Sequence, residues 1–122
     1  MLVLAAVLMF LTGLAHSYLG ERYLLIRLFR RENLPELLGS TAFTTGTLRF
    51  VWHLLTVVWW GVAILTYRAS EQPLEPKMVL QAFSAVALVS GLFPLVFTRG
   101  KHLSWVTFFA VAALLWFAAA GA

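Results

Sequence analysis

The chain has 122 residues, of which 61% are hydrophobic and 11% charged, and its mean hydropathy is +0.88. A soluble domain carries about 25% charged residues, so this composition excludes an ordinary soluble domain and indicates an integral membrane protein. The formal net charge of +4 is then first a signal of orientation in the membrane, and no nucleic-acid partner is expected. The absence of cysteine excludes disulfides, thiolate metal sites and thiol catalysis.

Four apolar segments predict an all-α membrane protein with a single membrane domain over residues 1–122. The first segment, about 1–19, is long enough to cross the hydrocarbon core as a helix, and no basic residue precedes it as in a secretory signal. Mixed basic and apolar residues then predict a cytoplasmic interfacial amphipathic helix over about 21–38. The other spans are expected at about 49–67, 78–97 and 103–121. Short connections favour an up-down-up-down four-helix bundle.

Basic residues are distributed unequally between the two ends of the predicted bundle. One end collects Arg22, Arg27, Arg30, Arg31, Arg49, Arg99 and Lys101, whereas the other end has only Arg68 and Lys77. The positive-inside rule therefore predicts a cytoplasmic first connection and places both termini outside, with a bacterial inner (plasma) membrane as the expected location. Anionic lipid headgroups are the expected partners of the basic end.

All three histidines fall at the basic end. The alternation of the helices brings His16, His53 and His102 to the same side of the membrane, with Glu21 at a similar level. An ionisable side chain within a span is by default a functional hypothesis, because polar groups are costly there. Three imidazoles, or two with a carboxylate, suit Zn, Fe or Cu, so the sequence predicts a transition-metal site.

Haem b is a second version of this site. His16 and His53 would be the axial ligands, and Arg22 and Arg49 could pair with the propionates. The residues expected around such a site are Thr12, Ser17, Thr56 and Trp60. Small residues that would allow close helix packing are Gly13, Gly20, Gly61 and Gly91.

Three classes of function follow from these patterns. The first is a metal- or haem-binding membrane protein, linked to redox chemistry or transport. The second is a cofactor-free accessory or assembly subunit of a larger membrane complex, in which His53 only bonds Thr12 or Ser17 between helices. The third is a homo-oligomeric channel or proton-coupled carrier with His16 and His53 as titrating groups. A four-helix bundle is filled by its own side chains, so a path would form between protomers.

Enzymatic activity is not predicted. The serines lack a nucleophile-elbow pattern and no glycine-rich phosphate loop is present, so any reaction would be metal-assisted, with Glu21 as base. The length and span number resemble those of small multidrug transporters. That family depends on a membrane-embedded glutamate in the first helix, whereas no predicted span here contains Asp or Glu, and this rules the assignment out.

Overall fold

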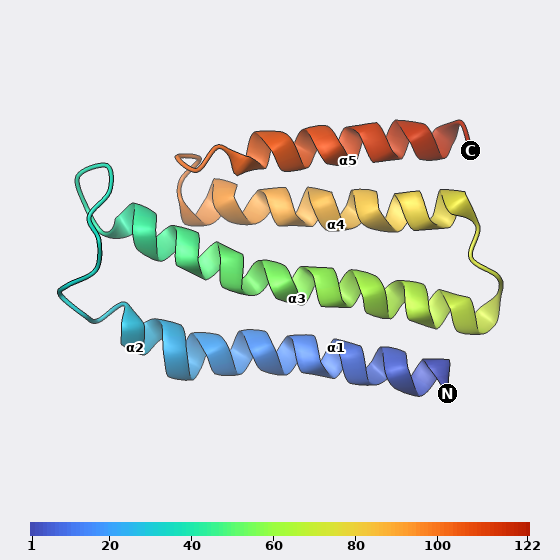
Figure 1. Cartoon of the computed structure of the whole chain (residues 1–122), viewed down its shortest axis with the longest axis horizontal. Helices are drawn as coiled ribbons and strands as arrows, with labels where there is room; N and C mark the ends of the chain where they lie inside the picture. Colours follow the sequence, from blue (N-terminus) through green and yellow to red (C-terminus); the bar gives the residue numbers. More distant parts are fainter.

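The computed structural model describes all 122 residues, and its regular elements are all helical. Each long helix runs antiparallel to its neighbours in the chain, and both termini lie at the end opposite the long first connection (Figure 1). The elements are α1 (Leu2–Leu19), the π-helical turn η1 (Gly20–Leu25), α2 (Ile26–Leu28), α3 (Ala42–Glu71), α4 (Pro76–Phe97) and α5 (Ser104–Ala120). Three helices are long and apolar enough to span a membrane, namely the continuous α1–η1–α2 helix, α3 and α4, and α5 is a shorter apolar helix. The expected all-helical fold is thereby confirmed, and the number of apolar helices is consistent with the predicted four.

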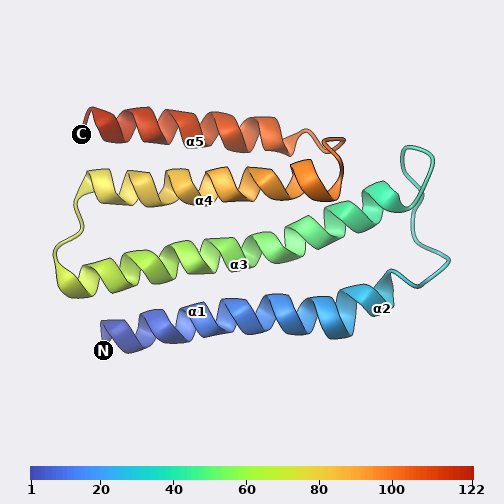
Figure 2. The same ribbon diagram turned by 180° about the vertical axis from the view of Figure 1, so that it is seen from behind.

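The four helices lie side by side in the order α1, α3, α4, α5, and both views show them in one layer (Figures 1 and 2). Helix α1 packs on α3, α3 on α4 and α4 on α5, and no contact joins α1 to α4 or to α5. The bundle therefore has an open form. Because no helix has more than two neighbours, only 18 of the 122 residues are buried, and many large apolar side chains lie on the surface. A surface of this kind is suited to contact with lipid.

The first connection differs from the prediction. The expected interfacial helix over about 21–38 does not form as a separate element, because residues 20–28 extend the first helix and residues 29–41 form turns. Leu38 and Gly39 have φ angles of 55° and 87°, in the left-handed region that a right-handed helix excludes. The first helix thus continues past residue 19, the predicted end of the first span.

Helix α3 begins at Ala42, well before the expected start near residue 49. The segment from Thr41 to Gly46 is rich in threonine, which has a low helix propensity. Its first turns are packed against the end of α4, since a Cβ atom added at Gly46 would lie 2.3 Å from the backbone oxygen of Phe97. Tertiary packing therefore overrides the local preference.

Helix α4 closely matches its predicted span and ends in a well-formed turn. Pro76 occupies the first turn, where its missing N–H is not needed. At the other end, Arg99 and Gly100 have φ angles of 53° and 76°, and the Gly100 amide donates to the Leu95 carbonyl at 2.8 Å. This left-handed C-terminal cap directs the chain into α5 and fixes the basic turn between the two helices.

Candidate functional site

Polar side chains of α3 bond the backbone of α1 over the middle part of the seam between these helices. The donors recur every four residues of α3, so they form a row on one face. The three bonds run from Trp52 Nε1 to the His16 carbonyl (3.1 Å), from Thr56 Oγ1 to the Gly13 carbonyl (3.0 Å) and from Trp60 Nε1 to the Phe10 carbonyl (3.1 Å). Trp52 was not among the predicted site residues, although its spacing from Thr56 and Trp60 was the available signal.

Two glycines of the first helix allow this close approach. A Cβ atom at Gly20 would lie 2.0 Å from Trp52 Nε1, and one at Gly13 would lie 2.8 Å from Trp60 Nε1. Two other glycines are equally crowded. An added Cβ atom would lie 2.4 Å from the Val86 side chain at Gly61 and 2.6 Å from a side chain of α5 at Gly91. Each helix pair is thus brought together at a residue without a side chain.

At the basic end, the α1–α3 seam carries a connected group of five side chains, which we call the polar cluster: Ser17, Glu21, Arg49, His53 and Thr56. The imidazole of His53 lies at its centre, with Nδ1 2.8 Å from Ser17 Oγ and Nε2 3.1 Å from Glu21 Oε2. The Ser17 hydroxyl is also 2.7 Å from Thr56 Oγ1. A continuous row of hydrogen bonds therefore leads from the carboxylate of Glu21 into the seam.

Glu21 also forms a two-point ion pair with Arg49. Arg49 Nη2 lies 2.8 Å from Oε1 of the carboxylate, and Arg49 Nε lies 3.2 Å from Oε2. The exposed fractions of the side chains are 17% for His53, 30% for Glu21 and 33% for Arg49. The imidazole is therefore the most shielded of the three groups, whereas the ion pair reaches the edge of the seam.

The π-helical turn η1 contains Glu21. A π-helical turn has i to i+5 hydrogen bonds, so it shifts the residues that follow around the helix axis relative to a regular α-helix. Such turns are rare and occur often at functional sites. Because η1 carries the carboxylate of the polar cluster, we take the polar cluster as the candidate functional site.

The three histidines are not brought together. The His16 ring is stacked on Trp52, with ring centres 4.6 Å apart, and its Nε2 lies 3.2 Å from the Trp52 carbonyl. His16 and His53 line different cavities, the first with Trp52 and the second with Glu21.

His102 lies in the turn after α4, and α3 separates this turn from the first helix and from His16. Its ring packs against Phe43 and Phe50, and its Nδ1 lies 2.8 Å from Ser104 Oγ. No group of three His, Asp or Glu side chains is arranged to hold a metal ion. The metal or haem site stays a prediction, and of its four proposed ligands only His53 and Glu21 are in contact.

The other predicted site residues, Thr12, Arg22 and Trp60, lie in three different places. Thr12 lines the cavity beside His16, and Arg22 lines the cavity that contains His53 and Glu21. Trp60 stacks on Phe10 with ring centres 5.0 Å apart, so it belongs to the packing of the seam.

Replacing Thr56 by valine is expected to lower the free energy of unfolding by about 1 kcal/mol, since interhelical hydrogen bonds in membrane proteins contribute about 0.6 and up to about 1.7 kcal/mol. The change keeps the side-chain shape and removes the bonds to Ser17 and to the Gly13 carbonyl. Equilibrium unfolding in detergent measures this loss of stability. Thr45→Val is the control, because the only hydrogen bond of the Thr45 hydroxyl is to the Ala42 carbonyl of its own helix; an equal loss in both variants contradicts the prediction.

Comparison of the chain with protein-family models, with curated proteins and with solved structures found no match.

Proposed function

We propose that the protein is a homo-oligomeric proton-coupled carrier or channel, in which the polar cluster binds and releases a proton. The observation that carries this proposal is the shielded imidazole of His53 between two oxygen partners, Ser17 Oγ and Glu21 Oε2. Histidine is the side chain that most readily changes its charge within the physiological pH range. An ionisable group of this kind between helices is typical of proton pathways.

Protonation of His53 would change the direction of hydrogen bonds across the seam. A protonated imidazole donates from both nitrogens, so Ser17 must accept, and the Ser17 hydroxyl proton is then directed to another partner. In the neutral ring only one nitrogen donates. The bond between Ser17 and Thr56 would transmit this change to the packed part of the α1–α3 seam.

The charged and titratable groups near His53 come from both helices of the seam. The first helix contributes Tyr18, Glu21 and Arg22 to the same cavity, and α3 contributes Arg49 through Glu21. Helix α4 faces the imidazole with an uncharged ring, that of Phe97, at 6.2 Å between ring centres. The charged group that bonds the imidazole is thus Glu21, which is itself paired with Arg49.

The proposed orientation follows the distribution of basic residues, with the polar cluster near the cytoplasmic face of a bacterial inner membrane and both termini outside. A single layer of helices encloses no path of its own, so the proton path would lie between protomers. A cofactor-free accessory subunit is the alternative, and it predicts no proton movement by the isolated protein.

Proton flux in proteoliposomes tests the proposal. Vesicles containing the purified protein and an internal pH-sensitive dye are given a potassium diffusion potential, and we expect acidification faster than in protein-free vesicles. His53→Gln is expected to reduce the protein-dependent rate at least tenfold, because the amide cannot take up the proton. His102→Gln is the matched control, since His102 makes no contact with the polar cluster.

Two results would overturn the proposal. The first is a proton flux equal to that of protein-free vesicles, which favours the accessory subunit. The second is a flux that His53→Gln and His102→Gln change to the same extent. Elution as a single species on size exclusion verifies that the variants are folded.

A further inference from the structure

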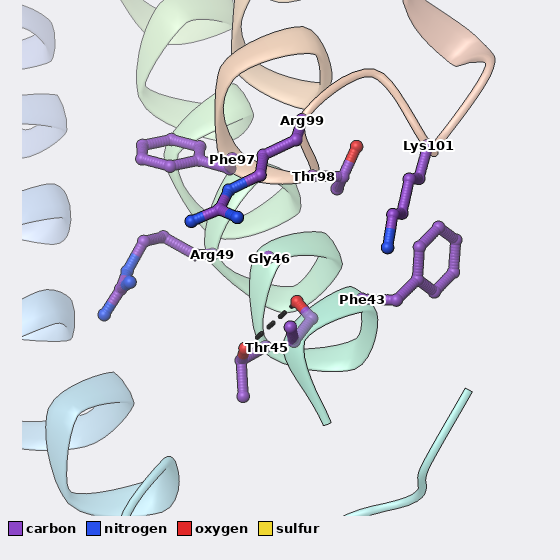
Figure 3. Close-up of a pocket in the computed structure, with 9 residues that line it drawn as sticks. Phe43, Thr45, Gly46, Arg49, Phe97, Thr98, Arg99 and Lys101 are labelled. Atoms are coloured by element: carbon purple, nitrogen blue, oxygen red, sulfur yellow. Dashed lines mark hydrogen bonds between the residues drawn. The ribbon is translucent and has the colours of Figure 1, made fainter. Parts of the chain in front are cut away.

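A cavity of about 260 Å³ lies at the basic end, between the first turns of α3 and the turn that joins α4 to α5 (Figure 3). Three cationic side chains line it, those of Arg49, Arg99 and Lys101, and no carboxylate does. Thr45 and Thr98 also line it, and their hydroxyl groups donate to the carbonyls of Ala42 and Pro94. The cavity is smaller than the pockets of about 300–1,000 Å³ that hold drug-sized ligands, so its size suits a single small anionic group.

Two of these cations have no partner in the protein. The side chains of Arg99 and Lys101 form no ion pair and no hydrogen bond, whereas Arg49 is bonded to Glu21. Figure 3 shows both side chains extending from the α4–α5 turn toward α3. Like charges that share a cavity repel one another, so an anion between them would be stabilised.

The turn that carries the two cations is held in place by several bonds. Thr98 is 4% exposed, and its hydroxyl donates to the Pro94 carbonyl at 2.5 Å and accepts a hydrogen bond from the His102 amide at 3.0 Å. Trp105 Nε1 donates to the Gly100 carbonyl at 3.1 Å. A turn fixed in this way loses little conformational entropy when a ligand binds.

Arg99 itself adopts a left-handed conformation, with φ of 53°. A residue with a Cβ atom is disfavoured there by about 1–2 kcal/mol, and such strain is concentrated at ligand-binding positions. The opposite wall includes Ala42 and Phe43, in the first turn of α3. The amides of a first helical turn have no acceptor within the helix and carry partial positive charge.

We propose that this cavity binds a phosphate group, with Arg99 and Lys101 as the main ligands and Arg49 as a third cation. Guanidinium and ammonium groups that line one cavity provide the charge-assisted hydrogen bonds that phosphate accepts. The phosphate comes either from the headgroup of an anionic lipid or from free phosphate. The proposal does not depend on proton transport, since Arg99 and Lys101 lie outside the polar cluster.

Isothermal titration calorimetry of the detergent-purified full chain, in phosphate-free buffer, tests this site. One arm uses inorganic phosphate, and the other uses short-chain phosphatidylglycerol with phosphatidylcholine as a neutral reference. We expect saturable binding with about one ligand per chain. The double variant R99Q/K101Q should bind about thirtyfold more weakly. Each basic residue near an anionic lipid surface raises the affinity about fivefold, and two such residues are removed.

The matched control is R30Q/R31Q, which removes the same charge from the same end of the protein and should change affinity less than twofold. The exchange R99K/K101R keeps both charges and should retain binding. Saturable binding of inorganic phosphate assigns the site to free phosphate groups, and binding of phosphatidylglycerol alone assigns it to a lipid headgroup. The proposal is overturned if neither probe saturates, or if the two double variants weaken binding equally and only a diffuse basic surface is present.

Discussion

Replacement of Gly46 by alanine is expected to lower the free energy of unfolding by about 2–3 kcal/mol. The added Cβ atom would lie 2.3 Å from the backbone oxygen of Phe97 and 3.0 Å from its carbonyl carbon. No side-chain rotation can relieve a clash with backbone, so α3 and α4 would have to move apart. This seam joins the two inner helices of the layer, and the change therefore affects the contact between the two halves of the protein.

Equilibrium unfolding in detergent micelles with increasing SDS measures this loss. Gly121→Ala is the matched control, because the nearest atom to the added Cβ, the Ala118 carbonyl oxygen, is at 3.9 Å, an ordinary contact distance. A Gly46→Ala variant as stable as Gly121→Ala would contradict the packing of α3 against the end of α4.

Neutralising Glu21 is the second change with a large expected effect. Glu21→Gln removes the charge that Arg49 and His53 share, and we expect a loss of about 1–2 kcal/mol. Removing one partner of a fully buried ion pair costs about 3–5 kcal/mol. The smaller value applies here because about one third of each side chain of the pair is exposed and solvent screens the interaction.

A double-mutant cycle with Arg49→Gln isolates the ion pair. The double variant should be about 1 kcal/mol more stable than the sum of the two single losses predicts, since the second substitution removes a charge already without its partner. Glu71→Gln provides the comparison, because its bond to Arg68 joins side chains that are 45% and 48% exposed, and its loss should be below about 0.5 kcal/mol. Additive losses in the cycle would show that Glu21 and Arg49 do not stabilise each other.

The helices themselves could be predicted because their length and apolar composition are local properties of the sequence. Pro76 marks the start of α4, and the Arg99–Gly100 pair marks the turn after it. The open layer could not be predicted in the same way. When most faces of each helix are apolar, the hydropathy pattern does not specify which faces meet, and the choice depends on the fit of particular pairs such as Gly20 with Trp52.

The candidate site was predicted in part. A hydrogen bond between His53 and Ser17 was among the alternatives, and it is present. Glu21 was among the predicted site residues, and it contacts His53. The π-helical turn that carries Glu21 was not predicted, because no sequence signal marks such a turn. The grouping of His102 with the other histidines rested on the alternation of the helices, which places all three at one end without bringing them into contact. Helix α3 stands between the His102 turn and the first helix.

The open layer also has a consequence for the order in which the chain is built. Every helix finds its packing partners among its immediate neighbours in the sequence, so α3 can dock on α1 before α4 has been synthesised. The polar cluster is then complete once about the first half of the chain exists, since its last residue is Thr56. The phosphate cavity must wait for the α4–α5 turn. Each helix therefore packs on a helix that is close to it in the sequence. Such local contacts favour rapid folding and leave little chance that the wrong helices pair.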